Sequence, residues 1–73
     1  MKSAIAGNVK EIIRGRCLKQ GAVARRAGYD EKTFSNMLNN RKIVTDVDVV
    51  NIANALEVNP NVLFGIEELV ERR

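Results

Sequence analysis

Side chains with hydrogen-bonding chemistry follow Asp30 within two turns of a predicted helix. Glu31 and Lys32 come first. Ser35 and Asn36 follow one turn later, on the same helix face. Lysine donates to guanine O6 and N7, asparagine pairs with adenine N6 and N7, and glutamate accepts from cytosine N4. The set therefore suits the edges of base pairs in a major groove. An ordinary solvated helix face also explains it, and Glu31 equally suits the positive end of a helix dipole.

The sequence offers little for catalysis or for metal binding. It has no histidine and one cysteine, Cys17, so a His/Cys metal site and an internal disulfide are excluded. It has no plausible nucleophile–base pair and no phosphate-cradling glycine loop. We therefore expect a protein that is not an enzyme, with no cofactor and no small-molecule ligand.

Length and hydropathy predict one small domain. A 73-residue chain buries only about 60% of the surface that its unfolded form exposes, so a second copy would add stability. The apolar runs are too short to span a membrane, and the N-terminus lacks the charged-then-apolar order of a signal peptide. The expected location is the cytoplasm, with no membrane contact.

The net charge of +3 is unevenly distributed along the chain. Residues 1–45 contain ten Lys and Arg against three acids, a net charge of +7. Residues 46–73 contain two Arg against six acids, a net charge of −4. This segregation indicates a basic face for a polyanion and a second face with another role. A mixed charged surface is the alternative.

A helix-turn-helix is predicted between residues 20 and 42. Ala24 is small at the point where a second helix would cross the first. Gly28, four residues later, can take the left-handed backbone that ends a helix at little cost. Asn39 and Asn40 suit the end of the second helix, because asparagine tolerates the same backbone.

Hydrophobic spacing and capping signals predict the other helices. Apolar residues from Ile5 to Cys17 share one helical face, so Cys17 is expected to be buried. Residues 43–50 also alternate like a strand, but Thr45 and Asp48 have the spacing of a capping box, which favours a helix. The predicted helices are 3–17 with Ser3 as its cap, 20–27, 31–38 after the N-cap Asp30, 46–56, 60–64 after Asn59, and a last turn or two within 66–72.

One set of residues agrees in type and mutual spacing, without gaps, with the pattern of a known protein family: Gln20, Val23, Ala24, Gly28, Phe34, Ile52, Ala53, Leu56 and Val58. With this set the chain resembles the phage-repressor/Cro-type (XRE-like) helix-turn-helix family over about residues 5 to 64. The resemblance implies an all-α, compact five-helix bundle of the phage-repressor DNA-binding type, with the third helix in the DNA major groove. It also implies dimers on two-fold operator DNA, with residues 65–73 as an extension of this single domain.

Two departures from the family's pattern are informative. Many members carry an arginine in the first helix and a glutamate at the end of the third, as a buried ion pair. Ile13 and Leu38 stand at the matching positions. When both charges are absent, no buried charge is left without a partner. Losing only one of them would reduce the free energy of unfolding by roughly 3–5 kcal/mol. Asn40 stands where glycine is common, and asparagine tolerates that backbone.

The resemblance implies roles for individual residues. Glu31, Lys32 and Asn36 match base-reading positions, and Gln20 matches a glutamine that binds a phosphate at a helix start. The predicted base readers are Glu31, Lys32, Ser35 and Asn36, and the predicted phosphate contacts are Lys19, Gln20, Asn39, Arg41 and Lys42. A solvated face explains Arg25 and Arg26 about as well as DNA contact does.

The C-terminal segment supplies the candidate dimer contacts. It carries more apolar surface than one small core is expected to absorb, and its acids make it unsuited to DNA. The candidates are Phe64, Ile66, Leu69 and Val70. The alternative is that this tail only covers the core of one chain.

Two hypotheses for function follow from these features. The first is a sequence-specific transcriptional regulator that binds double-stranded operator DNA as a homodimer, a repressor of phage or mobile-element type. The second is an antitoxin-like module, which would neutralise a protein partner through its acidic, apolar C-terminus and bind DNA only to regulate its own operon.

Overall fold

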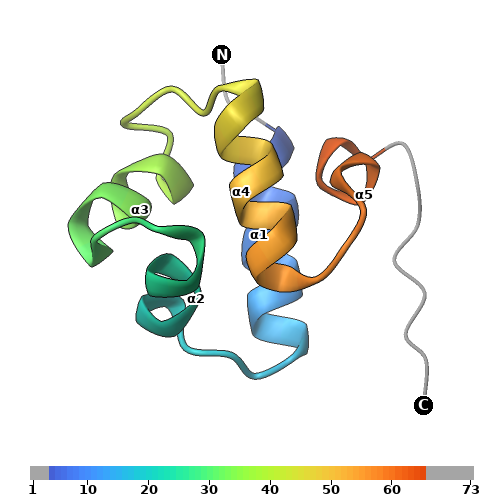
Figure 1. The fold of residues 1–73 in the computed structure, drawn as a ribbon, viewed down its shortest axis with the longest axis horizontal. Helices are drawn as coiled ribbons and strands as arrows, with labels where there is room; N and C mark the ends of the chain where they lie inside the picture. The colour runs from blue at the N-terminus through green and yellow to red at the C-terminus, as the bar shows by residue number, and fades with distance from the viewer. Residues whose placement is uncertain (1–3, 66–73) are drawn as a thin grey trace.

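The structure, a computed structural model, describes residues 4–65, and every regular element within them is a helix. The elements are α1 (Ala4–Gly15), α2 (Gln20–Ala27), α3 (Glu31–Leu38), α4 (Asp46–Leu56) and α5 (Pro60–Phe64), shown in Figure 1. α2 packs against α3 and α4, α1 packs against α3 and α5, and α5 also packs against α4. The prediction of a small all-α bundle of five helices is confirmed. None of these five helices is long and apolar enough to cross a lipid bilayer.

One apolar core joins all five helices. Its members are Val9, Ile12, Ile13, Val23, Ala24, Phe34, Met37, Leu38, Val49, Ile52, Ala53, Ala55, Leu56 and Leu63. Ala24 is fully buried, as a close helix crossing at that position requires. Ile13 and Leu38 both lie in this core, and residues 4–65 bury no polar or charged residue. The core therefore has no unpaired charge at the two positions where the resembled family carries an ion pair.

The N-terminal caps predicted for α3, α4 and α5 are confirmed. Asp30 accepts a hydrogen bond from the amide three residues on, at 2.7 Å. Thr45 and Asp48 form both bonds of a capping box at the start of α4, and Asn59 accepts from an amide in the first turn of α5. Residues 46–50 therefore belong to a helix rather than to a strand, because the capping box satisfies the first amides of α4 and its apolar face is buried, and residues 43–45 precede it as a loop.

The helix ends show where sequence periodicity misleads. Gly28 and Asn40 both have positive φ, of 90° and 60°, as predicted. The predicted burial of Cys17 is wrong: α1 ends at Gly15, and Cys17 is exposed with a φ of 55°. The Leu18 amide reaches back to the Ile13 carbonyl at 2.9 Å, which is the bond of a left-handed helix end. The turn thus places Cys17 outside the buried face of α1.

Two other expectations concern the limits of the helices. Val58 lies two residues beyond the end of α4 rather than in the fourth helix, and it packs half-buried against the core. The predicted cap Ser3 and the predicted last helical turn within 66–72 lie outside the described residues.

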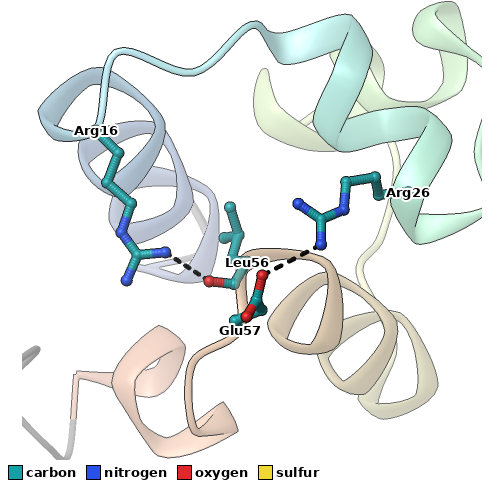
Figure 2. Close-up of polar contacts among 4 residues, drawn as sticks. All are labelled: Arg16, Arg26, Leu56 and Glu57. Carbon is teal, nitrogen blue, oxygen red and sulfur yellow. Dashed lines mark hydrogen bonds and ion pairs between the residues drawn. The ribbon is translucent and has the colours of Figure 1, made fainter.

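Two arginines hold the C-terminal end of α4, as Figure 2 shows. Arg16 donates to the Leu56 carbonyl at 2.6 Å, and Arg26 pairs with the Glu57 carboxylate at 3.2 Å. Cations suit this end because it carries the negative partial charge of the helix dipole. The Arg26 ion pair is largely exposed and contributes about 0–1 kcal/mol. Arg26 is therefore directed at α4, an arrangement that the sequence left open.

Candidate nucleic-acid interface

α3 has two chemically distinct faces. Its apolar side chains, Phe34, Met37 and Leu38, are each no more than 2% exposed. The four predicted base readers lie on the rest of its surface, where Glu31 and Lys32 are exposed and Ser35 and Asn36 are half-buried. Burial of the apolar face fixes which way the polar face points. α3 therefore presents donors and acceptors outward from the apolar core, which is what a helix in a groove requires.

The predicted phosphate contacts lie at both sides of this face. Lys19 is the N-cap of α2, and Gln20 is its first residue. Asn39 is the C-cap of α3, and Arg41 and Lys42 follow in the loop to α4. All five are exposed. Figure 1 shows α2, α3 and this loop together on one side of the molecule, with α5 on the other.

The start of α2 is suited to an anion. Lys19 has an extended backbone, with φ −90° and ψ 130°, but its side chain makes no capping hydrogen bond. The first amides of a helix have no acceptor within the helix, and a lysine side chain cannot accept a hydrogen bond. The Lys19 side chain therefore leaves the first amides of α2 uncapped, next to the Gln20 amide and the Lys19 charge, but the Glu31 carboxylate lies over the same turn and would compete with a phosphate oxygen there.

Glu31 lies beside this start of α2. Its carboxylate occupies the space that a Cβ at position 21 would take, so only glycine fits at Gly21 without displacing it. The carboxylate thus sits over the first turn of α2 while Glu31 itself opens α3. This placement puts the Glu31 carboxylate near the positive end of the α2 dipole, whereas the sequence pointed only to the dipole of the helix that Glu31 itself opens.

The turn before α3 is anchored by Tyr29, to which the sequence gave no functional role. The Tyr29 hydroxyl donates to Asp48 Oδ1 at 2.5 Å and accepts from the Asn51 amide at 3.3 Å. Its ring stacks on Phe34, with centroids 6.3 Å apart. Asp48 Oδ2 also accepts from the Thr45 amide and hydroxyl, both at 3.0 Å. One carboxylate therefore joins the turn between α2 and α3 to the start of α4.

The pKa values of this pair move in opposite directions. Burial, followed by the hydrogen bond to Asp48, raises the pKa of the Tyr29 hydroxyl. The Tyr29 hydroxyl and then the Thr45 amide lower the pKa of Asp48. Both shifts stabilise the same state, a neutral phenol donating to a carboxylate.

Lys10 of α1 is a second residue that the sequence analysis missed. Its ammonium donates to Asn39 Oδ1 at 3.3 Å, and the Asn39 amide donates to Ser35 Oγ at 3.3 Å. Asn39 and Ser35 both belong to the predicted DNA-contacting set. No local spacing signals this contact, because Lys10 and Asn39 are 29 residues apart.

Apolar side chains are also exposed away from α3. Phe64, the dimer candidate at the end of α5, is 46% exposed. The other dimer candidates, Ile66, Leu69 and Val70, lie outside the described residues. Near the start of α4 the exposed fractions are 83% for Ile43 and 63% for Val47, and no periodicity argument singled these two out.

In comparisons with known proteins, no protein-family model, no curated protein and no solved structure matches the chain.

Proposed function

We propose that this protein is a sequence-specific, double-stranded DNA-binding transcriptional regulator in which α2 and α3 act as a helix-turn-helix. The observation that carries the proposal is the two-faced α3. Its apolar face is buried, and its polar face is flanked by Gln20 at the start of α2 and by the basic loop after α3. In this proposal α3 enters the major groove, because its donors and acceptors match base edges there.

Within this function the residues divide into two groups. Lys32 and Asn36, with Ser35 beside them, read bases, whereas the predicted phosphate contacts set the register on the duplex. For Glu31 both a base contact and an interaction with a helix dipole remain open. The protein acts in the cytoplasm as a homodimer on a two-fold operator, and a repressor of phage or mobile-element type is the regulator that we propose.

Salt dependence is the experiment that tests DNA binding. If one chain neutralises about four phosphates and a dimer about eight, log affinity falls with log salt at a slope of about −7. Affinity is then expected to fall about 10⁴-fold between 50 and 200 mM salt. Fluorescence anisotropy with a labelled duplex, chosen by selection from random DNA, measures this slope. A slope near zero contradicts the proposal.

Single substitutions separate base reading from positioning. Lys32→Ala is expected to cost about 1–3 kcal/mol on the preferred site and to relax the preference at one base pair per half-site. Arg41→Ala is expected to weaken binding to all sequences by a similar factor and to make the salt slope shallower by about one per chain. Titrations against the selected site and its single-base variants measure both. Equal losses on every duplex for both variants would reject the division of roles.

The dimer surface is tested by truncation. We propose that Phe64 and the segment after it pair two chains about a two-fold axis, which would set the two copies of α3 about 34 Å apart. Sedimentation of a chain that ends at Gly65 is expected to show a monomer, compared with a dimer for the full chain. A truncated chain that still sediments as a dimer would place the interface elsewhere.

A further inference from the structure

We propose that Lys10 of α1 binds a phosphate of the DNA backbone jointly with Asn39, so that a third helix contributes to the interface. The inference rests on the proposed DNA-binding function and deepens it, since it assigns a contact outside α2, α3 and their loop. The contact would lie at the C-terminal end of α3, on the side of the groove opposite the start of α2.

The three backbone amides that follow α3, those of residues 39–41, already donate within the chain. The Asn39 backbone amide donates to the Ser35 carbonyl at 3.0 Å, and the Asn40 backbone amide donates to the Met37 carbonyl at 3.3 Å. The Arg41 amide donates to a carbonyl five residues back at 2.8 Å. A helix C-terminus also carries negative partial charge, which repels an anion. A phosphate at this end therefore needs side-chain donors and a cation close to them.

Lys10 supplies a side-chain donor and a positive charge beside Asn39, at the end of α3. Within residues 4–65 its ammonium makes one hydrogen bond, to Asn39 Oδ1, and an ammonium has three donors. The Asn39 amide nitrogen has two N–H groups, of which one donates to Ser35. Because the Lys10 and Asn39 groups are already 3.3 Å apart, a phosphate oxygen that accepts from Asn39 lies within reach of the lysine charge.

The contact also gives Asn39 a defined orientation. Its carbonyl oxygen faces the lysine and its nitrogen faces Ser35, so its remaining N–H points to neither. Lys10 additionally offsets the negative end of α3 that a phosphate would otherwise meet. If capping α3 were the whole role of Lys10, its removal would alter stability and geometry, but the number of phosphates neutralised would stay the same.

The test measures the salt slope of binding for the full chain and three variants on a random-sequence duplex of about 20 base pairs, since phosphate contacts dominate non-specific binding. Lys10→Gln keeps a donor for Asn39 and loses the charge, whereas Lys10→Arg keeps the charge. Arg26→Gln is the matched control, because it also removes one positive charge but from the side chain paired with Glu57. Circular dichroism checks that each variant is folded.

For Lys10→Gln the slope per bound chain is expected to be shallower by about 0.9, so its affinity deficit shrinks as salt rises. Lys10→Arg and Arg26→Gln are expected to keep the wild-type slope. An unchanged slope for Lys10→Gln, whatever its affinity, overturns the proposal and leaves Lys10 as a positioning residue. A wild-type slope near zero instead overturns DNA binding itself, and the inference with it.

Discussion

Replacing Phe34 with alanine is expected to remove about 3–5 kcal/mol from the free energy of unfolding, because the ring is buried and its loss leaves a cavity. Phe34 is 0% exposed, lies in the shared core and stacks on Tyr29. A chain of this length holds roughly 4–11 kcal/mol in total, so the variant should be close to unfolding at 25 °C. Urea unfolding followed by circular dichroism measures the loss.

Phe64→Ala is the matched control for this prediction. The same atoms are removed, but Phe64 is 46% exposed at the end of α5, so the loss within one chain should stay below about 1 kcal/mol. Measurement at low protein concentration keeps any effect on dimer formation out of the comparison. Equal losses at the two positions would contradict the buried position of α3 on the core.

The second large effect is expected at Asp48. Asp48→Ala removes the acceptor of the Tyr29 hydroxyl and half of the capping box of α4, for an expected loss of about 1–3 kcal/mol. Asp46→Ala is the control, since Asp46 is an exposed acid in the first turn of the same helix, where the dipole contributes about 0.3–1 kcal/mol. If both variants lose the same stability, the Tyr29–Asp48 link contributes nothing.

The difference between these two variants should depend on pH. The pKa of Asp48 is lowered in the fold, so its contribution is present above the pKa of the unfolded carboxyl, about 3.9. That contribution is lost as the pH falls through the lowered pKa. The excess loss of Asp48→Ala over Asp46→Ala is therefore expected at pH 7 and should shrink in acid. Urea unfolding at several pH values measures it, and a pH-independent excess would contradict the role of the carboxylate.

The same bond limits stability in alkali. The pKa of the Tyr29 hydroxyl is raised in the fold, so the stability that it contributes is complete below the ordinary tyrosine pKa of about 10. It is lost as the pH rises through the raised value. Because Tyr29 stands in the turn between α2 and α3, weakening this bond also loosens the link between that turn and the start of α4.

Much of the fold could be predicted from the sequence because helix limits depend on neighbours a few residues apart. The Thr45–Asp48 capping box, the Asp30 cap and the positive φ at Gly28 are such local features. The turn after α1 has its left-handed residue at Cys17, not at a glycine or asparagine that would mark it in the sequence. The burial of Cys17 was therefore mispredicted.

Apart from the end of α1, the sequence alone determined the helices, their buried faces and the polar face of α3, because hydrophobic period and capping act within one element. Only the tertiary structure decided what reaches that face from elsewhere. Lys10 meets Asn39 across 29 residues, Arg26 meets Glu57 across 31, and Tyr29 meets Asp48 across 19. These contacts depend on the angles at which helices cross, and no spacing along the chain encodes those angles.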